Sequence, residues 1–464
     1  MENTNKKFGT APVFFTAIST ILGAILFLRF GFAVGTVGFI GVGLIILLGH
    51  LITIPTALAI SEIATNKRVE GGGEYFIISR SFGLNIGATI GIALYLSQAI
   101  SVAFYVIAFT EAFQFFFEYV RQNYGYDLPR QVISVPAMLL LSLLILRKGA
   151  NLGVKALYAV VFILAISILL FFLGDTGFAG RANFSLPDVQ FRHSDDFFLV
   201  FAIIFPAFTG MTAGVGLSGD LKEPGKSIPI GTISATLIGM IIYFFIAYKL
   251  ASSASPEDLM GDQFIMAKVA LFGFVMIPLG LAASTISSAL GSVMVAPRTL
   301  QALANDDSFP LPNINRFLSK ERSKDREPYN ASLVTCGLAM IFVILGDVNA
   351  VAQIISMFFM ITYGSLCLIS FLNHFGTSPS YRPTFKSKWY ISFVGFFFAV
   401  WVMFKINFGY TIAATIMMTL LYIYVNNYHR NRKGLSSIFA NTIFQLNRNL
   451  QLYLQKSKII RGSD

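Results

Sequence analysis

The sequence predicts an all-α polytopic membrane protein with about twelve transmembrane helices, and three observations lead to this fold class. Hydrophobic residues make up 55% of the 464-residue chain and charged residues only 12%, whereas a soluble domain carries roughly 25% charged residues. Long apolar stretches recur along the chain, each close to the roughly 20 residues that a spanning helix needs. Lys and Arg gather in alternate connecting segments, as they do on the cytoplasmic side of membrane proteins.

Twelve apolar stretches are long enough to cross a bilayer. The third and the eighth are long enough to be tilted or to extend past the bilayer. In chain order the stretches are 12–34, 38–63, 84–119, 131–148, 151–174, 198–218, 230–252, 264–304, 329–346, 350–373, 389–406 and 409–427.

The distribution of positive charge predicts the orientation of the chain. With a cytoplasmic N-terminus, 26 of the 34 Lys and Arg residues lie on the cytoplasmic side and 8 on the other. The opposite orientation inverts this ratio. We therefore expect a multi-pass protein of the cell membrane, plasma or inner, with cytoplasmic segments at 1–11 and 428–464. The basic segment 428–464 resembles the start of a cytosolic domain, which indicates either a lineage without that domain or a truncated chain.

The first ten stretches divide into two groups of five, 12–174 and 198–373, and two C-terminal helices follow at 389–427. An odd number of helices in each half puts the halves in opposite orientations, which is the 5+5 inverted repeat of LeuT-like transporters. Helices 1 and 6 are expected to be discontinuous, at residues 19–24 and 206–214. Paired interruptions indicate a central transport site, although glycine also serves close helix packing.

The centre of the membrane carries no residues suited to catalysis. No Asp, Glu, Lys or Arg lies near the middle of stretches one, three, six, eight or ten, and the four His and two Cys residues lack metal-ligand spacing. A membrane enzyme needs clustered His or carboxylates at that depth, so we expect no enzyme and no cofactor. The net charge of +11 is an orientation signal, not a nucleic-acid footprint.

An uncharged centre binds either ions that neutralise each other or a zwitterion. Free carbonyls at the end of one half-helix favour a cation, and free N–H groups at the start of the next favour an anion. The hydroxyls of Ser284, Thr285, Ser287 and Ser288 add the oxygen ligands that hard cations prefer. The alternative for these hydroxyls is bonding to their own helix.

Two tyrosines and two opposite charges complete the candidate residues. Tyr105 and Tyr363 lie mid-membrane, where a phenol needs a hydrogen-bond partner. Arg29 follows Gly23 by six residues, as Glu111 follows Tyr105, so both lie roughly 9 Å outward of the centre at 1.5 Å per residue. An ion pair between them would close the external path. The alternative is that each is an interfacial residue near a helix end.

The motifs, taken in order from about residue 10 to 435, resemble those of the cation–chloride cotransporters. This resemblance rests on the order of the motifs along the chain and not on any single motif. The segments that match are 21–29 (ILGAILFLR), 63–66 (IATN), 71–75 (GGGEY), 78–81 (ISRS), 205–210 (FPAFTG), 217–224 (LSGDLKEP), 287–290 (SSAL), 296–298 (APR), and the pairs at 378–379, 382–383 and 385–386.

The resemblance implies electroneutral symport of chloride with sodium, potassium or both, by alternating access. Carried over by matching position, the sodium ligands are Ser287 and Ser288, with carbonyls of Ser19, Leu22 and Ser284. The potassium ligands are Tyr105 and Thr209, with carbonyls of Thr20, Ile21 and Pro206. One chloride meets the backbone at Gly23, Ala24 and Ile25, and a second meets Gly210, Met211, Thr212 and the Tyr363 hydroxyl. Arg29 and Glu111 match the external gate of the family.

The resemblance also leaves alternatives open. The Ser287–Ser288 pair favours sodium coupling and Tyr105 favours potassium, whereas Thr20 and Leu22 replace the Asn and Trp usual in animal members. The expected partners are the lipid bilayer, small inorganic ions and, by resemblance alone, a second copy of the chain. The rival function is a sodium-coupled symporter of a small neutral amino acid. A passive channel or scaffold would leave the paired interruptions unexplained.

Overall fold

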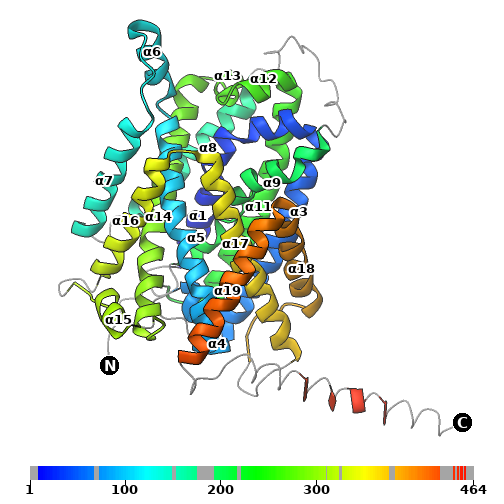
Figure 1. The fold of residues 1–464 in the computed structure, drawn as a ribbon. Coiled ribbons are helices and arrows are strands. Elements are labelled where there is room, and N and C mark those ends of the chain that lie inside the picture. The colour runs from blue at the N-terminus through cyan, green and yellow to red at the C-terminus, as the bar shows by residue number, and fades with distance from the viewer. Residues whose placement is uncertain are drawn as a thin grey trace, which may run out of the picture.

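The computed structural model describes residues 9–66, 73–148, 153–174, 193–216, 221–309, 311–322, 327–375 and 382–428, with scattered residues between 443 and 455. These residues form helices and no sheet, which confirms the predicted all-α class. Most of the helices run along one bundle axis (Figure 1). The predicted cytoplasmic segments 1–11 and 428–464 lie almost wholly outside the described residues.

Helices follow one another with short connections through the described chain. The first group is α1 (Thr10–Ile21), α2 (Ala24–Leu28), α3 (Phe30–Asn66), α4 (Gly73–Phe82), α5 (Leu84–Glu111), α6 (Gln114–Tyr124), α7 (Gln131–Lys148) and α8 (Gly153–Leu173). The second group is η2 (Ser194–Asp196), α9 (Phe197–Ile204), η3 (Phe205–Phe208), α10 (Met211–Val215), α11 (Pro224–Ser253), α12 (Pro256–Gly261), α13 (Ile265–Val269), α14 (Gly273–Asn305), α15 (Pro312–Leu318), α16 (Tyr329–Leu345), α17 (Val348–Phe375), α18 (Trp389–Ile406) and α19 (Phe408–Tyr428).

Nine helical stretches in the described ranges are long and apolar enough to cross a membrane. Three shorter apolar helices lie where the fourth, fifth and ninth stretches are predicted, in α7, α8 and α16. Large apolar side chains such as Leu140, Phe162 and Leu345 are exposed on these helices, as expected for surface that lipid covers. The predicted membrane class therefore fits the structure, and the count of twelve stays a prediction.

The structure divides the two longest predicted stretches. In the stretch 84–119, α5 ends at Glu111 and α6 begins at Gln114, because Phe113 leaves helical geometry (φ −98°, ψ 18°). In the stretch 264–304, α14 begins only at Gly273, because Phe272 has a left-handed φ of 53° that a right-handed helix cannot contain. Each of these stretches is thus one long helix with a short separate helix beside it, and the predicted tilt or extension past the bilayer stays a prediction.

Gly38 marks the boundary between the first two predicted stretches. Its φ of 74° and ψ of 173° interrupt α3, and only glycine adopts such a backbone conformation without strain. The residues of α3 before Gly38 therefore continue the first helix, and those after it form the second.

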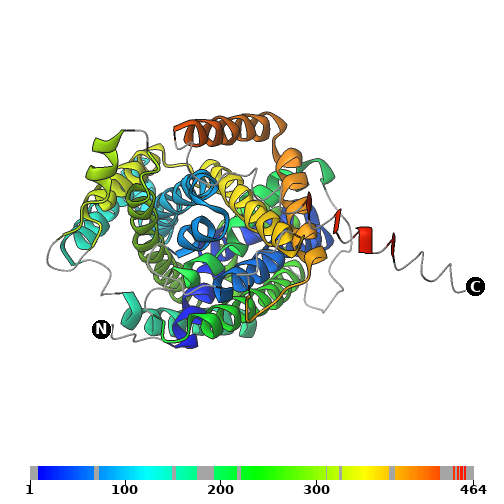
Figure 2. The same cartoon turned by 90° about the horizontal axis from the view of Figure 1, so that it is seen from below.

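The interrupted helices lie inside the bundle. α1 packs against α8, α10, α11 and α14, and α9 packs against α3, α17 and α18. Three aromatic side chains of helix six, Phe201, Phe205 and Phe208, are fully buried. By contrast, α19 lies on the outside of the bundle when it is seen from below (Figure 2). The structure therefore encloses both interruptions within a shell of other helices.

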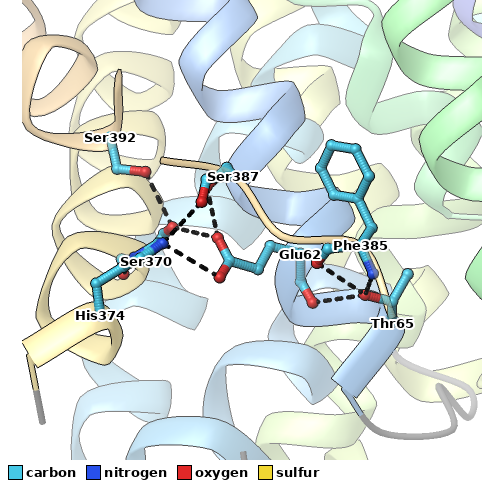
Figure 3. A network of polar contacts seen from close by, with 7 residues as sticks. All are labelled: Glu62, Thr65, Ser370, His374, Phe385, Ser387 and Ser392. Atoms are coloured by element: carbon cyan, nitrogen blue, oxygen red, sulfur yellow. Dashed lines mark hydrogen bonds and ion pairs between the residues drawn. The ribbon is translucent and has the colours of Figure 1, made fainter. Parts of the chain in front are cut away.

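A polar network joins α3, α17, α18 and the connection before α18 (Figure 3). Glu62 accepts hydrogen bonds from Ser370 Oγ at 3.1 Å and Ser387 Oγ at 2.5 Å. His374 Nε2 lies 3.5 Å from Glu62 Oε1, and Ser370 shares a hydrogen bond with Ser392 at 2.9 Å. Three side chains thus contact the buried Glu62 carboxyl group, and this network connects the four elements.

Candidate functional site

Helix one leaves helical geometry at the residues that the sequence singles out. α1 ends at Ile21, α2 begins at Ala24, and between them lie Leu22 (φ −80°, ψ 44°) and Gly23 (φ −92°, ψ −153°). Such an interruption leaves the last carbonyls of one half and the first N–H groups of the next without intrahelical partners. All the predicted ligands of this segment are buried: Ser19, Thr20, Ile21, Leu22, Gly23, Ala24 and Ile25.

Helix six is interrupted at Thr209 and Gly210. The α9 helix passes into the single 3-10 turn η3, and α10 begins at Met211. The Thr209 hydroxyl donates to the Pro206 carbonyl at 2.8 Å, and the Thr212 hydroxyl donates to the Thr209 carbonyl at 3.2 Å. All five residues are buried, so hydroxyls and carbonyls of this segment lie inside the bundle and away from lipid.

The two interruptions lie directly against each other. A Cβ atom at position 210 would lie 2.5 Å from the Ile21 nitrogen and 2.9 Å from the Thr20 carbonyl carbon. These are backbone atoms, so no side chain at position 210 fits without separating the two helices. The fold thus brings the predicted potassium ligands Thr20 and Ile21 next to those of helix six.

Tyr243 of α11 contacts this junction, although the sequence analysis did not single it out. Its hydroxyl donates to the Ile21 carbonyl at 2.6 Å. Its fully buried ring packs edge-on against Phe208 and tilted against Phe30. The Tyr105 phenol lies within electrostatic range of it. One carbonyl predicted to bind potassium is therefore already hydrogen-bonded to a phenol.

Tyr363 of α17 lies on the other side of helix six. Its hydroxyl, predicted to contact chloride, donates to the Thr209 carbonyl at 2.7 Å. The amide of buried Gln98 donates to the Thr212 hydroxyl at 3.2 Å. The structure therefore brings together two predicted chloride ligands, Tyr363 and Thr212, and adds Gln98 as a neighbouring polar group.

The predicted sodium ligands on α14 differ in how their hydroxyl groups are hydrogen-bonded. Ser284 donates to the carbonyl of Leu281 at 3.1 Å, which is the self-bonded alternative for a membrane serine. Ser288 Oγ is buried and makes no hydrogen bond of normal geometry within the described residues, although the Tyr105 phenol lies close to it. Ser287 is half-buried. The predicted sodium and potassium ligands thus meet at Ser288 and Tyr105.

Arg29 and Glu111 are joined through a third residue. Arg29 donates from Nε to Asn349 Oδ1 at 2.7 Å and from Nη1 to Gln263 Oε1 at 2.8 Å. Gln263 Nε2 then donates to Glu111 Oε2 at 3.0 Å, and Arg130 lies 3.4 Å from the same oxygen. The amide of Gln263 thus forms a bridge that reaches both Arg29 and Glu111, and the external gate formed by these two residues stays a prediction.

This bridge lies at the end of the bundle where α12 and α13 lie (Figure 1). The carboxyl groups of Glu111 and Asp347 lie within electrostatic range of Arg29. An arginine guanidinium keeps its charge in proteins. The bridge therefore contains a positive and a negative group whose charges offset each other. It links the α2–α3 junction, α5, the α12–α13 connection and α17.

Four polar residues at these sites were not predicted from the sequence. Tyr243 and Gln98 lie within apolar stretches, and they carry the same signal as Tyr105, a buried polar group that needs a partner. A polar side chain within an apolar stretch is therefore a signal that could have identified Tyr243 and Gln98. Gln263 and Asn349 lie near helix ends, where neither composition nor spacing distinguishes them from other polar surface residues.

Comparisons with known proteins agree with this architecture. Residues 12–461 match the family model described as amino acid permease. Cation-chloride cotransporter 1 of Oryza sativa subsp. japonica is 30% identical over 478 residues, which cover 92% of this chain and 48% of the relative. Solute carrier family 12 member 1 of Mus musculus is 32% identical over 478 residues, 90% of this chain and 43% of the relative.

Solute carrier family 12 member 2 of Homo sapiens is 32% identical over 481 residues, 90% of this chain and 38% of the relative. The chain spans less than half the length of these curated relatives. The family match covers all the interrupted and surrounding helices, and its fold is consistent with the LeuT-like repeat predicted from the sequence. The chain belongs to the amino acid permease family, and it matches the cation–chloride cotransporters over most of its length.

Proposed function

We propose that the chain is a secondary active symporter that couples chloride to sodium, potassium or both. The observation that carries this proposal is the contact of Gly210 with the backbone of Thr20 and Ile21, which puts together two helix interruptions whose own residues, 19–25 and 206–212, have no charged side chains. Carbonyls and N–H groups of the two half-helices then lie near one another. Such a site binds a cation and an anion together more readily than either alone.

Electroneutral transport by alternating access follows from the same reasoning. Each net charge moved across the membrane gains or costs about 2.3 kcal/mol per 100 mV. Balanced binding of cations and chloride removes this dependence on membrane potential. We further propose that the chain lies in the cell membrane with both ends of the helical region at the cytoplasm, as its Lys and Arg distribution favours.

The proposed cation ligands lie at the junction and on α14. Ser288 supports a sodium position because its buried oxygen makes no hydrogen bond among the described residues. The Ile21 carbonyl accepts a hydrogen bond from the Tyr243 hydroxyl. A carbonyl oxygen has two lone pairs, so the Ile21 carbonyl is still able to face potassium.

The two proposed anion positions differ in the groups that would bind chloride. At the first position, chloride would meet the N–H groups at the start of α2, from Gly23 to Ile25. At the second position, chloride would compete with the Thr209 carbonyl for the single hydroxyl proton of Tyr363. Anion binding at the second position should therefore release Tyr363 from helix six.

A second candidate function is sodium-coupled symport of a small neutral amino acid. The match to a family model described as amino acid permease favours it. A zwitterion would place its carboxylate on the start of α2 and leave the sodium ligands of α14 unchanged. The two candidates differ in the solute that drives cation uptake.

Uptake by purified protein in liposomes tests the proposal. We expect uptake of labelled chloride to rise when sodium, potassium or both are present, and uptake of rubidium to need chloride. Liposomes without protein give the background. Chloride uptake that is indifferent to both cations would refute the symport, and sodium uptake driven by a neutral amino acid would favour the second candidate.

The Tyr105→Phe substitution tests the potassium position. It removes one hydroxyl oxygen and keeps the ring, so we expect the KM for rubidium to rise about tenfold, from the loss of ~1.4 kcal/mol of ligand interaction. Tyr95→Phe is the matched control, because Tyr95 lies in the same helix and faces Thr335 of α16. Equal rubidium KM values in both variants would remove Tyr105 from the site.

A further inference from the structure

Glu74 is a buried carboxyl group that the proposed transport cycle does not use. It lies in the first turn of α4 and is 4% exposed. Neither of its carboxyl oxygens has a hydrogen-bond partner within the described ranges of the chain. A buried carboxylate without partners is strongly unfavourable, whereas a neutral carboxylic acid tolerates the same place far better.

Glu62 shows how this protein accommodates a carboxyl group in a similarly buried place. It is 1% exposed, but two serine hydroxyls donate to it and the ring of His374 lies beside it (Figure 3). Among the residues that the structure describes, Glu74 has no such partner. The two carboxyl groups thus differ in chemical environment, although α3 and α4 pack against each other.

Two observations place Glu74 near the proposed second anion position. The α4 helix packs against α10, which begins with Met211 and Thr212. The Glu74 carboxyl also lies within electrostatic range of the Tyr363 phenol, the group that donates to the Thr209 carbonyl. A negative charge on Glu74 would therefore act on an anion held beside Tyr363.

Two cations of α4 and α14 that the structure describes have other partners. Arg80 binds Asp306, as does Tyr75, and Arg298 of α14 lies 3.6 Å from Glu327. Burial raises the pKa of the Glu74 carboxyl to about 8. The charged and titratable groups on α4 and the helices packed against it are Tyr75, Arg80, His50, Glu62, Tyr95, Tyr105, Glu111 and Arg298.

We propose that Glu74 is a proton-binding site beside the second anion position, and that a proton on Glu74 and chloride beside Tyr363 bind together. This inference rests on the proposed function. A neutral Glu74 presents no charge to the anion, whereas an ionised Glu74 repels it. Because linkage is reciprocal, chloride must also favour protonation of Glu74 by the same factor.

The sign of the pH dependence follows from this linkage. Below pH 8 Glu74 is mainly neutral and chloride binds well; as the pH rises past 8, the carboxylate forms and chloride binding weakens. We expect the KM for chloride to rise about tenfold from pH 7 to pH 9 in liposomes with equal pH on both sides and saturating sodium and potassium. In Glu74→Gln, a permanently neutral side chain, the KM should stay near the low value across this range.

Glu62→Gln is the matched control, because glutamine keeps an acceptor oxygen for the two serines. It should retain the rise in chloride KM seen with the parent protein. A flat chloride KM in the parent protein, or an unchanged rise in Glu74→Gln, would overturn the role of Glu74 while leaving chloride symport intact. Absence of chloride uptake at every pH would overturn both proposals.

Titration calorimetry of chloride into the detergent-purified parent protein gives a test that needs no variant. At pH 8, chloride binding should take up protons, so the measured heat should change between two buffers of different ionisation enthalpy. Glu74→Gln, where it folds, should bind chloride with a heat that is independent of the buffer. The competing explanation is a Glu74 carboxylate that stays ionised at the start of α4; it predicts no proton uptake by the parent protein, and that result would refute the inference.

Discussion

Liposomes that carry the Gly210→Ala variant are expected to take up chloride at least about tenfold more slowly than those with the parent protein. The added methyl group would lie 2.5 Å from the Ile21 nitrogen, closer than atoms approach without a shift of the backbone. Overpacking of this kind costs about 1–3 kcal/mol, and a shift that separates the helix interruptions misplaces ligands from both. The measurement is the initial rate of chloride uptake at saturating cations, normalised to the amount of inserted protein.

Gly337→Ala is the matched control for this change. Gly337 lies in α16, and a Cβ atom there meets nothing within 4 Å. We expect its uptake to equal that of the parent protein, since alanine in a helix is favourable by about 1 kcal/mol relative to glycine. Size-exclusion chromatography of both variants separates a folded, inactive protein from an aggregated one. A folded Gly210→Ala protein with parental uptake would show that the two helices separate without consequence for the site.

The second large effect is expected from Arg29→Ala, which should lower chloride uptake about tenfold or more. Removing the guanidinium breaks its hydrogen bonds to Asn349 and Gln263 and leaves Glu111 with Arg130 as its remaining charged partner. Disrupting a partly buried charge network of this kind costs several kcal/mol. We expect the closed arrangement of this end of the bundle to be lost, and transport to slow because the cycle needs it.

Gln263→Leu tests whether the bridge carries the effect. Leucine removes both amide contacts, so the double variant Arg29→Ala with Gln263→Leu should be little worse than Arg29→Ala alone. Arg121→Ala is the control, because Arg121 pairs with Asp127 where both side chains are more than 70% exposed, and such surface pairs contribute little. Strictly additive losses in the double variant would show that Arg29 and Glu111 act independently of Gln263.

The candidate site was partly predictable because some of its signals are local. Gly23 and Gly210 stand out in the sequence, since small residues interrupt an apolar run at corresponding places in two halves. Tyr105 and Tyr363 stand out because a phenol in an apolar helix needs a partner. The partner itself was not predictable: Tyr363 donates to the Thr209 carbonyl, and Ile21 receives its hydrogen bond from Tyr243, which lies 222 residues away along the chain.

The sequence by itself determined the all-α membrane class, the approximate positions of the apolar helices and the residues at which helices one and six are interrupted. These features depend on composition and on patterns within about 20 residues, which the chain carries locally. Only the tertiary structure decided that Gly210 touches Ile21, that Gln263 joins Arg29 to Glu111, and that Glu74 is buried with no hydrogen-bond partner in the described part of the chain. Each of these three features depends on which distant segments pack together, and the local sequence pattern does not specify that packing.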